Sequence, residues 1–144
     1  MYTVHESSLS PSIYSIIACE IDNLDKAYEL YSRTSKLDLD NYNNDTEDGL
    51  HITSMSGAWL SIVQGFSGMR INNQILAFSP KLPKKWKGYS FNINYRDNKL
   101  KVDINQNGIK INNSEGNDIE VNIYDEKYII KNNKYIENKK LVFN

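Results

Sequence analysis

Two motifs bring a histidine together with small hydroxyl residues, and each stands in front of an apolar pattern of helical spacing. The first is residues 5–11, His-Glu-Ser-Ser-Leu-Ser-Pro, and the second is residues 51–59, His-Ile-Thr-Ser-Met-Ser-Gly-Ala-Trp. Hydroxyl groups, an imidazole and the backbone N–H groups of a helix start can all donate hydrogen bonds into one small volume. The two motifs therefore favour the binding of an anion or a polyol.

The second motif has features beyond its hydroxyl groups. Gly57 allows close approach to the backbone, and a helix that begins at Ser54 or Ser56 would add positive potential beside His51. The same serines also suit ordinary N-capping, in which a hydroxyl oxygen accepts hydrogen bonds from the first N–H groups of a helix. These residues leave oxyanion binding and simple capping open as alternatives.

Metal-binding interpretations are weaker. His5 and His51 are the only histidines, and neither has a carboxylate at ligand spacing, so no metal site is predicted at either. The acidic segment 38–50 fails the pattern of a calcium-binding loop, because Asn43 replaces the required glycine and Gly49 replaces the final glutamate. We therefore expect its carboxylates to be solvated charges of a polar loop: Asp38, Asp40, Asp45, Glu47 and Asp48.

Cys19 is the only cysteine, so the chain cannot form an internal disulfide. It stands among apolar residues, which is typical of a packed core rather than of a nucleophile. A lone thiol suits a reducing compartment, and a cytoplasmic location is predicted. The first residues lack the charged and apolar regions of an export signal, and no apolar run is long enough to span a membrane.

Three helices are expected before residue 69. Ser10 and Pro11 predict the start of the first, because the hydroxyl caps N–H groups and proline fits the first turn. Asp22 and Asn23 interrupt the apolar pattern and are expected to cap the second helix. Ser54 or Ser56 is expected to start the third. Apolar residues recur at helical spacing at Ile13, Ile16, Ile17 and Ile21, at Leu24, Ala27, Tyr28 and Tyr31, and at Trp59, Leu60, Ile62, Val63 and Phe66.

From Met69 onward the apolar period changes to two, which is the period of a half-buried strand. Turn signals separate the alternating segments at Asp97-Asn98, Asn107-Gly108, Glu115-Gly116-Asn117, Asp125-Glu126 and Asn132-Asn133. Strands spaced about ten residues apart with tight turns indicate an antiparallel meander or sandwich.

The distribution of charge supports two structural units, residues 1–68 and 69–144. The net charge of the whole chain is −1, but residues 1–76 hold four basic and ten acidic residues, and residues 77–144 hold thirteen basic and eight acidic ones. A basic excess spread over a strand-rich segment is typical of a solvated surface. Neither a nucleic acid nor a membrane is predicted as a partner.

Several segments closely resemble glycoside hydrolase family 65, which contains the maltose, trehalose, kojibiose and nigerose phosphorylases. The resemblance runs in order and with family-like spacing through residues 2–96, and residues 97–144 share only the character of a strand-rich tail. The segments that carry it are residues 5–11, 24–28, 37–44, 49–55, 59–66 and 82–86.

The resemblance implies an α+β fold with the last three helices of an (α/α)6 barrel, followed by a C-terminal antiparallel β-sandwich. It also implies inverting, phosphate-dependent cleavage of an α-glucosyl disaccharide to β-glucose 1-phosphate and glucose. Inorganic phosphate is then a co-substrate, and no cofactor is expected.

The resemblance also implies site residues. The hydroxyl motif of the family contributes to its phosphate site, and it corresponds here to His51, Ser54, Ser56 and Gly57. Family members usually read Ser-Met-Ala-Gly-Thr-Trp, so this chain gains a hydroxyl at Ser56 and lacks one at Ala58. By the same resemblance, His5 and Glu6 are sugar-binding residues.

The general acid of the family is a glutamate in an earlier barrel helix, and it has no counterpart in these residues. We therefore expect no catalytic residue in this chain and no phosphorylase activity from it alone. The alternative is a non-catalytic carbohydrate-binding or assembly module that completes a barrel encoded separately or associates with itself. In that case a partner would cover apolar residues of the helices: Ile13, Ile16, Ile17, Tyr28, Tyr31, Trp59 and Ile62.

Overall fold

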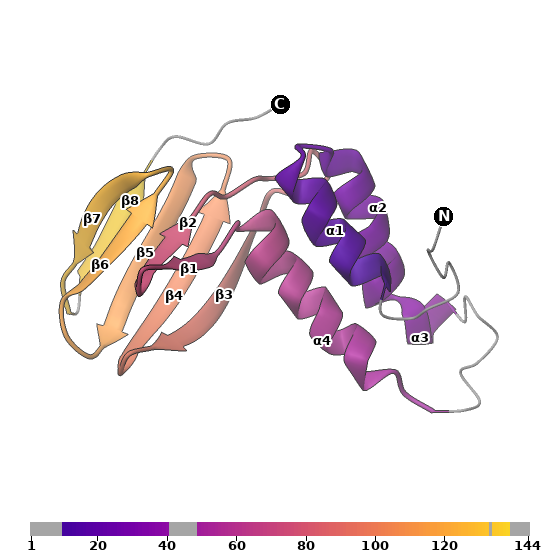
Figure 1. Cartoon of the computed structure of the whole chain (residues 1–144), viewed down its shortest axis with the longest axis horizontal. Helices are drawn as coiled ribbons and strands as arrows, with labels where there is room; N and C mark the ends of the chain where they lie inside the picture. Colours follow the sequence, from indigo (N-terminus) through magenta and orange to yellow (C-terminus); the bar gives the residue numbers. More distant parts are fainter. Residues whose placement is uncertain (1–9, 41–48, 133, 139–144) are drawn as a thin grey trace. The chain divides into compact units, whose positions relative to one another are not determined.

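The computed structural model describes residues 10–40, 49–132 and 134–138, and it has the predicted α+β layout of helices followed by strands (Figure 1). The chain divides into two compact units, residues 1–66 and 67–144. The helices are α1 (Ser10–Glu20), α2 (Leu24–Ser35), α3 (Leu37–Asp40), α4 (Ile52–Leu60) and the π-helix η2 (Ser61–Phe66). The strands are β1 (Arg70–Asn72), β2 (Ile75–Phe78), β3 (Gly88–Tyr95), β4 (Asn98–Asn105), β5 (Gly108–Glu115), β6 (Ile119–Ile123), β7 (Glu126–Ile130) and β8 (Lys134–Asn138).

Helices α1 and α2 form a helical hairpin (Figure 1). Helix α1 begins at Ser10 with Pro11 in its first turn, as expected. Asn23 caps α2, because its side-chain oxygen accepts a hydrogen bond from the backbone N–H of Lys26 at 3.1 Å. Asp22, just before this cap, has a φ of 60°, which turns the chain sharply between the two helices.

Small residues fill the contact between α1 and the helix formed by α4 and η2. A Cβ atom added to Gly57 would lie 2.6 Å from the Oγ of Ser12, so the two helices approach too closely for a side chain at position 57. The Ser61 hydroxyl donates to the carbonyl oxygen of Gly57 at 2.9 Å and lies 3.3 Å from that of Ser12. The other buried small residues of these helices include Ser15, Ala18, Cys19, Ser54 and Gly65.

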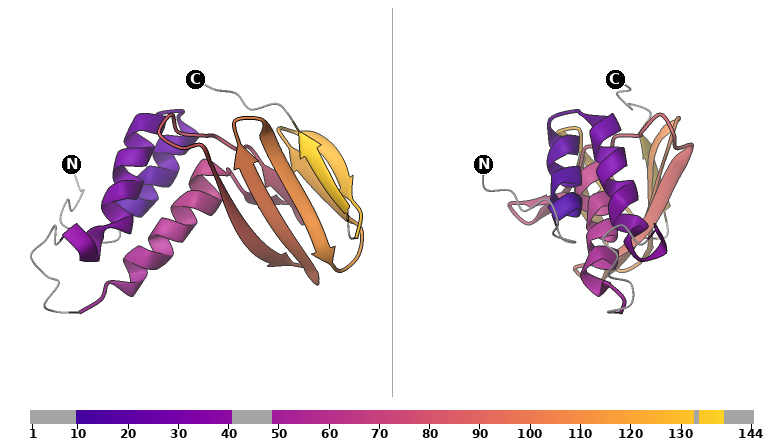
Figure 2. Two further views of the ribbon diagram at one scale, coloured as in Figure 1. Left: turned by 180° about the vertical axis from the view of Figure 1, so that it is seen from behind. Right: turned by 90° about the vertical axis from the view of Figure 1, so that its right-hand side faces the viewer.

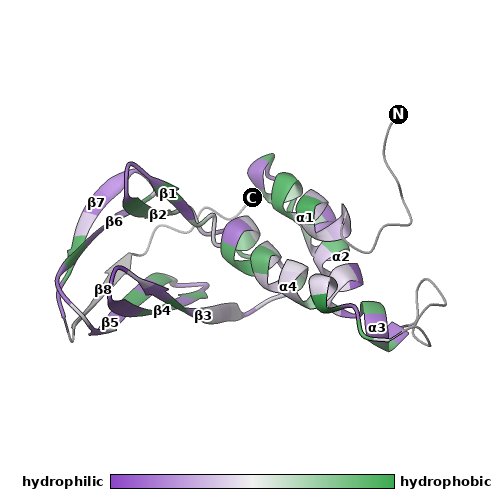
Figure 3. Cartoon of the chain, turned by 60° about the horizontal axis from the view of Figure 1, so that its bottom comes forward, coloured by the Kyte–Doolittle hydropathy of each residue, from purple (hydrophilic) through white to green (hydrophobic). Residues whose placement is uncertain are grey.

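The large apolar residues of α1 and α4 lie on the opposite, exposed side of each helix. Successive residues of an α-helix are rotated by 100°, so Ile13 and Ile17 share one face of α1 and point away from the small buried residues. Ile21, in the turn directly after α1, continues this face, because its backbone N–H donates to Ile17 as in a further helical position. Ile52, Met55 and Trp59 form the corresponding stripe on α4. Both helices carry green, hydrophobic segments in Figure 3. We call these two stripes the exposed apolar faces of α1 and α4.

Helix α4 begins earlier than predicted. It begins at Ile52, with His51 at the N-cap position, whereas the serine motif predicted a start at Ser54 or Ser56. His51 takes this position because a carboxylate from α3, described below, binds its ring and its backbone N–H, while its carbonyl oxygen accepts the backbone N–H groups of Ser54 and Met55. At its other end α4 continues as the π-helix η2, and Gly68, with a φ of 59°, follows it.

The strands form two four-stranded sheets, in the orders β1-β2-β6-β7 and β3-β4-β5-β8, which appear as separate layers in Figures 2 and 3. All pairs among the described strands are antiparallel, as predicted, except β2 and β6, which are parallel. The exception follows from the chain path, because β3, β4 and β5 lie between these two strands in sequence and belong to the other sheet.

The predicted alternation is present in the strands, and their buried positions form the core of this unit. In β4, for example, Leu100, Val102 and Ile104 are buried while Lys99 and Lys101 are exposed. The other fully buried large side chains of the strands are Leu76, Phe78, Ile109, Ile111, Val121, Ile123 and Ile130. Among the residues that the structure describes, no helix is both long and apolar enough to cross a membrane.

The tight turns lie one residue earlier than predicted. The β3–β4 turn is Arg96–Asp97 rather than Asp97–Asn98, and the β6–β7 turn is Tyr124–Asp125 rather than Asp125–Glu126. Both residues of each turn have positive φ, between 47° and 65°, as in a type I′ turn. Asn98, which the predicted β3–β4 turn included, is instead buried at the start of β4.

Candidate functional site

The imidazole of His51 is paired with the carboxylate of Asp38. The two residues are thirteen positions apart, at the N-cap of α4 and in α3. The His51 Nδ1 and Asp38 Oδ1 atoms are 2.6 Å apart, and the His51 backbone N–H donates to Oδ1 at 3.3 Å and to Oδ2 at 3.1 Å. Both side chains are largely buried, with exposed fractions of 20% for His51 and 16% for Asp38. Asp38 therefore holds both the ring and the backbone of His51.

The hydrogen bonds fix the protonation of this pair. An ionised carboxylate can only accept, so the proton in the short contact belongs to His51 Nδ1. The hydrogen bond from the His51 ring, assisted by the one from its backbone N–H, lowers the pKa of Asp38 below its usual value of 3.8. At neutral pH Asp38 is therefore an anion, and Nε2 lies on the side of the ring that faces away from it.

The hydroxyl residues of α4 do not gather on one side of the helix. Ser54 and Ser56 are two positions apart, which places them on opposite sides because each position turns by 100°. Ser54 is buried, on the same side as Gly57, whereas Ser56 is exposed and donates to the carbonyl oxygen of Ile52 at 3.2 Å. Within the predicted set, the side chain of His51 is held by a group from another element, the carboxylate of Asp38 in α3.

Two of the predicted site residues cannot be compared with the structure, and one residue that contacts the site was not predicted. His5 and Glu6, the predicted sugar-binding residues, lie outside the described residues. Asp38 was expected to be a solvated loop charge, but it lies in α3 and binds His51. No local signal in the sequence marks this pair, because its geometry depends on how α3 is placed relative to α4.

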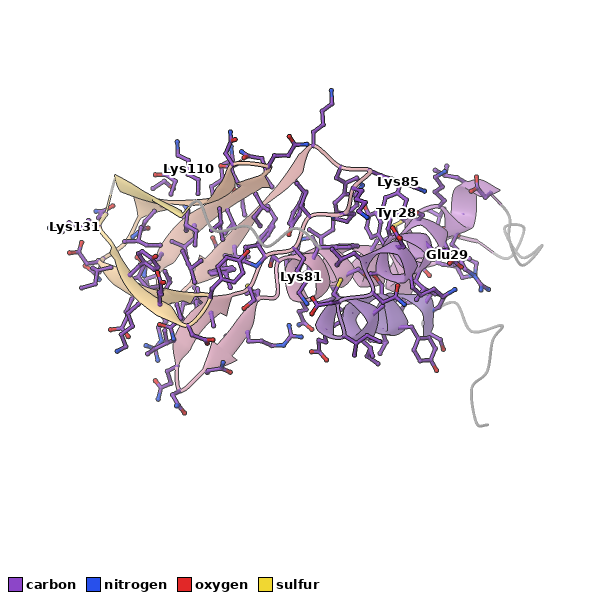
Figure 4. All side chains as sticks on the ribbon, turned by 90° about the horizontal axis from the view of Figure 1, so that it is seen from above. Tyr28, Glu29, Lys81, Lys85, Lys110 and Lys131 are labelled. Carbon is purple, nitrogen blue, oxygen red and sulfur yellow. The ribbon has the colours of Figure 1, made fainter. Side chains whose placement is uncertain are left out.

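Basic side chains in the strand-rich unit are spread over several segments. Figure 4 labels Lys81 and Lys85 in the connection before β3, Lys110 on β5 and Lys131 after β7, and these come from different parts of the unit. Others face carboxylates of their own sheet, as in the contact of 2.9 Å between Lys127 Nζ and Glu120 Oε1. This arrangement fits the expectation of a solvated surface.

Both units of the chain match sequence models of known protein families. Residues 1–60 match the sequence model described as the glycosyl hydrolase family 65 central catalytic domain. Residues 69–130 match the one described as the glycosyl hydrolase family 65, C-terminal domain. His51, Ser54, Ser56, Gly57 and Asp38 all fall within the first match.

Individual relatives agree with these matches. A maltose phosphorylase of Bacillus subtilis is 53% identical over 90% of this chain and 17% of its own length. An alpha,alpha-trehalose phosphorylase of Thermoanaerobacter brockii is 43% identical over 90% of this chain and 17% of its own length. A kojibiose phosphorylase of Halothermothrix orenii is 33% identical over 99% of this chain and 18% of its own length.

A solved structure is similar to the whole described fold. It is a human-microbiome protein assigned as a kojibiose phosphorylase, with a TM-score of 0.90 and 39% identity over 99% of this chain and 21% of that chain. The chain thus spans about a fifth or less of the relatives that it matches. By both family matches and by these relatives, the chain belongs to glycoside hydrolase family 65.

Proposed function

We propose that the chain is the C-terminal part of an inverting disaccharide phosphorylase and supplies the phosphate-binding end of its active site. The reaction would use phosphate to cleave an α-glucosyl disaccharide such as maltose, trehalose or kojibiose, giving β-glucose 1-phosphate and glucose. The relatives named as maltose, trehalose and kojibiose phosphorylases support this reaction class. The observation that carries the phosphate assignment is the imidazole of His51, held in place by Asp38 at the N-terminus of α4.

The proposed phosphate-binding residues are His51, Ser54, Ser56 and Gly57. The first turn of α4 adds favourable potential for an anion, because N–H groups and the positive end of the helix dipole point out of it. His51 provides a ring nitrogen at the same helix end. The contact between Gly57 and Ser12 gives this glycine a packing role as well, since it lets α4 lie directly against α1. His5 and Glu6 remain the proposed sugar-binding residues.

The groups that the reaction requires are divided between this chain and the rest of the active site. In an inverting reaction an acid protonates the leaving oxygen while the nucleophile attacks from the opposite face. In a phosphorylase, phosphate takes the place of the attacking water, so the protein must bind the phosphate and supply the acid. We propose that this chain binds the phosphate, that the acid comes from another part of the barrel, and that the 144-residue chain alone is inactive.

Two measurements test this proposal on the purified chain. The NMR signals of His51 should shift and saturate as inorganic phosphate is added at millimolar concentration. An assay with phosphate and maltose, trehalose or kojibiose should release no glucose 1-phosphate. Unchanged His51 signals would overturn the phosphate assignment, and phosphate-dependent release of glucose 1-phosphate would overturn the proposed division of the site.

A second candidate function, an assembly module, is favoured by the exposed apolar faces of α1 and α4. Ile21 is 70% exposed and Trp59 48%, although neighbouring small residues of the same helices are buried. A missing barrel segment or a second copy of the chain would cover these faces. Sedimentation of the purified chain distinguishes the two candidates, because a monomer that binds phosphate supports the first, and stable oligomers without phosphate binding support the second.

The cellular location is also a proposal. Cys19 is a buried thiol that forms no disulfide, which supports the expected reducing, cytoplasmic environment. Fractionation of cells that naturally produce this protein would test this location directly.

A further inference from the structure

We propose that Asp38 is a positioning residue for phosphate binding, which acts by holding the ring and the backbone of His51 in one orientation. This inference rests on the proposed phosphate-binding role of His51. Asp38 itself would not touch the phosphate, because an anionic carboxylate repels an anion.

The structure gives Asp38 a well-fixed position. Helix α3 follows α2 after a single residue, Lys36, whose carbonyl oxygen accepts the backbone N–H groups of Leu39 and Asp40, each at 2.9 Å. Leu37 is buried and attaches the start of α3 to the helical unit. A carboxylate on so short a helix can position a partner only if the helix is itself held in this way.

The contacts to His51 restrict its ring more than a single hydrogen bond would. The bond from Nδ1 prevents rotation of the ring, and the two contacts from the backbone N–H keep the N-cap residue at the same carboxylate. Because Nδ1 carries the proton of the short contact, the direction of Nε2 is determined by the position of Asp38. A phosphate bound at the start of α4 would then meet the ring nitrogen in a single, preset geometry.

Direct repulsion of the phosphate by Asp38 and positioning of His51 by Asp38 predict opposite effects of removing the Asp38 charge. If the carboxylate acted on phosphate only through its charge, Asp38→Asn would strengthen phosphate binding by removing a repulsion. If the carboxylate positions His51, the same substitution would weaken binding, because the asparagine amide can present a donor to Nδ1 and the ring loses its fixed proton. The sign of the change therefore separates the two accounts.

The experiment measures phosphate affinity of the 144-residue chain and two matched variants by titration. Asp40→Asn is the control, because Asp40 lies on the same short helix, is exposed and loses the same charge. We expect Asp38→Asn to weaken phosphate binding about 10-fold, by analogy with the loss of groups that orient a metal-ligating histidine, and Asp40→Asn to leave it unchanged or slightly tighter. In a His51→Asn background, Asp38→Asn should cause no further loss.

A second measurement needs no substitution at Asp38. The ring-nitrogen NMR signals of the unchanged chain at neutral pH should show His51 Nδ1 carrying a proton, and Asp38→Asn should change that pattern while Asp40→Asn should not. Phosphate binding by Asp38→Asn as tight as by the unchanged chain, or a His51 Nδ1 without a proton, would overturn the positioning role alone. Absence of phosphate binding by the unchanged chain would overturn the proposed function, and the role of Asp38 with it.

Discussion

One carboxylate, Asp38, holds the N-cap residue of α4 by its ring and by its backbone N–H. His51 occupies the N-cap position and makes no capping bond with its own side chain, and its backbone N–H is instead bonded to Asp38. The same carboxylate accepts the ring Nδ1–H, so the start of α4 and the orientation of the imidazole depend on a single ionised group.

The first prediction concerns the pH dependence of this pair. The folded structure lowers the pKa of Asp38 below 3.8, so its ionised form stabilises the fold at neutral pH. That contribution is complete above pH 3.8 and is lost as the pH falls below it and Asp38 becomes protonated. Denaturant unfolding should therefore show Asp38→Asn less stable than the unchanged chain at pH 7, with a smaller difference below pH 3.8. A difference that stays constant over this range would contradict the prediction.

The second prediction concerns a buried pair of asparagines in the strand-rich unit. The side-chain amide of Asn113 donates to Asn98 Oδ1 at 3.0 Å and to the carbonyl oxygen of Asn117 at 2.8 Å. Asn113→Ala would leave these acceptors without their donor, and it should destabilise the chain by about 1–3 kcal/mol in denaturant unfolding. Asn112→Ala on the same strand, where the side chain is less buried, is the matched control and should cost less.

The small-residue contact between α1 and α4 gives the third prediction. Alanine is a better helix former than glycine, so Gly57→Ala would stabilise an isolated helix by about 1 kcal/mol. Here the new Cβ would lie 2.6 Å from Ser12 Oγ and 2.7 Å from Ser12 Cβ, so we expect a net loss of about 1–3 kcal/mol from overpacking. Thermal unfolding should show this loss, and Ser12→Gly in the same chain should recover part of it. Gly57→Ala with unchanged or raised stability would mean that the helices lie farther apart.

Local patterns in the sequence were sufficient to predict most elements of the fold. The start of α1 at Ser10, the cap at Asn23 and the alternation of the strands depend on neighbouring residues, and all three were predicted. The start of α4, the π-helix η2 and the parallel β2–β6 pair depend on contacts between distant segments, and none was predicted. The candidate site follows the same division. His51 belongs to a local sequence motif that could be recognised, whereas Asp38 is identified only by its contact with His51 in the structure.

The exposed apolar faces give the chain as a whole an unusual distribution of hydrophobic residues. In an ordinary amphipathic helix the large apolar residues face the core, but α1 buries serine, alanine and cysteine and exposes Ile13 and Ile17. Ile21, directly after α1, is also exposed. The chain spans 17% of the length of the Bacillus subtilis relative, and under the proposed function a barrel segment outside these residues would cover both faces.

The fourth prediction tests these faces. Replacing Ile17 and Trp59 together by glutamine should change the stability of the chain by no more than about 0.5 kcal/mol for each residue, because both side chains are partly exposed. The same variant should reduce association with a barrel segment or with a second copy, measured by sedimentation. Phe66→Ala is the contrast, because Phe66 is fully buried and its loss should cost about 3–5 kcal/mol. A large loss of stability in the double variant would show that the faces are covered within the chain.

A chimera with a close relative tests the proposed function most directly. The C-terminal part of the Bacillus subtilis maltose phosphorylase, 53% identical over the matched residues, would be replaced by this chain. The decisive measurement is the KM for phosphate during release of glucose 1-phosphate from maltose, with and without His51→Asn in the transplanted segment. We predict an active chimera whose phosphate KM rises at least about 10-fold on His51→Asn. A folded, active chimera with an unchanged phosphate KM after this substitution would contradict the account.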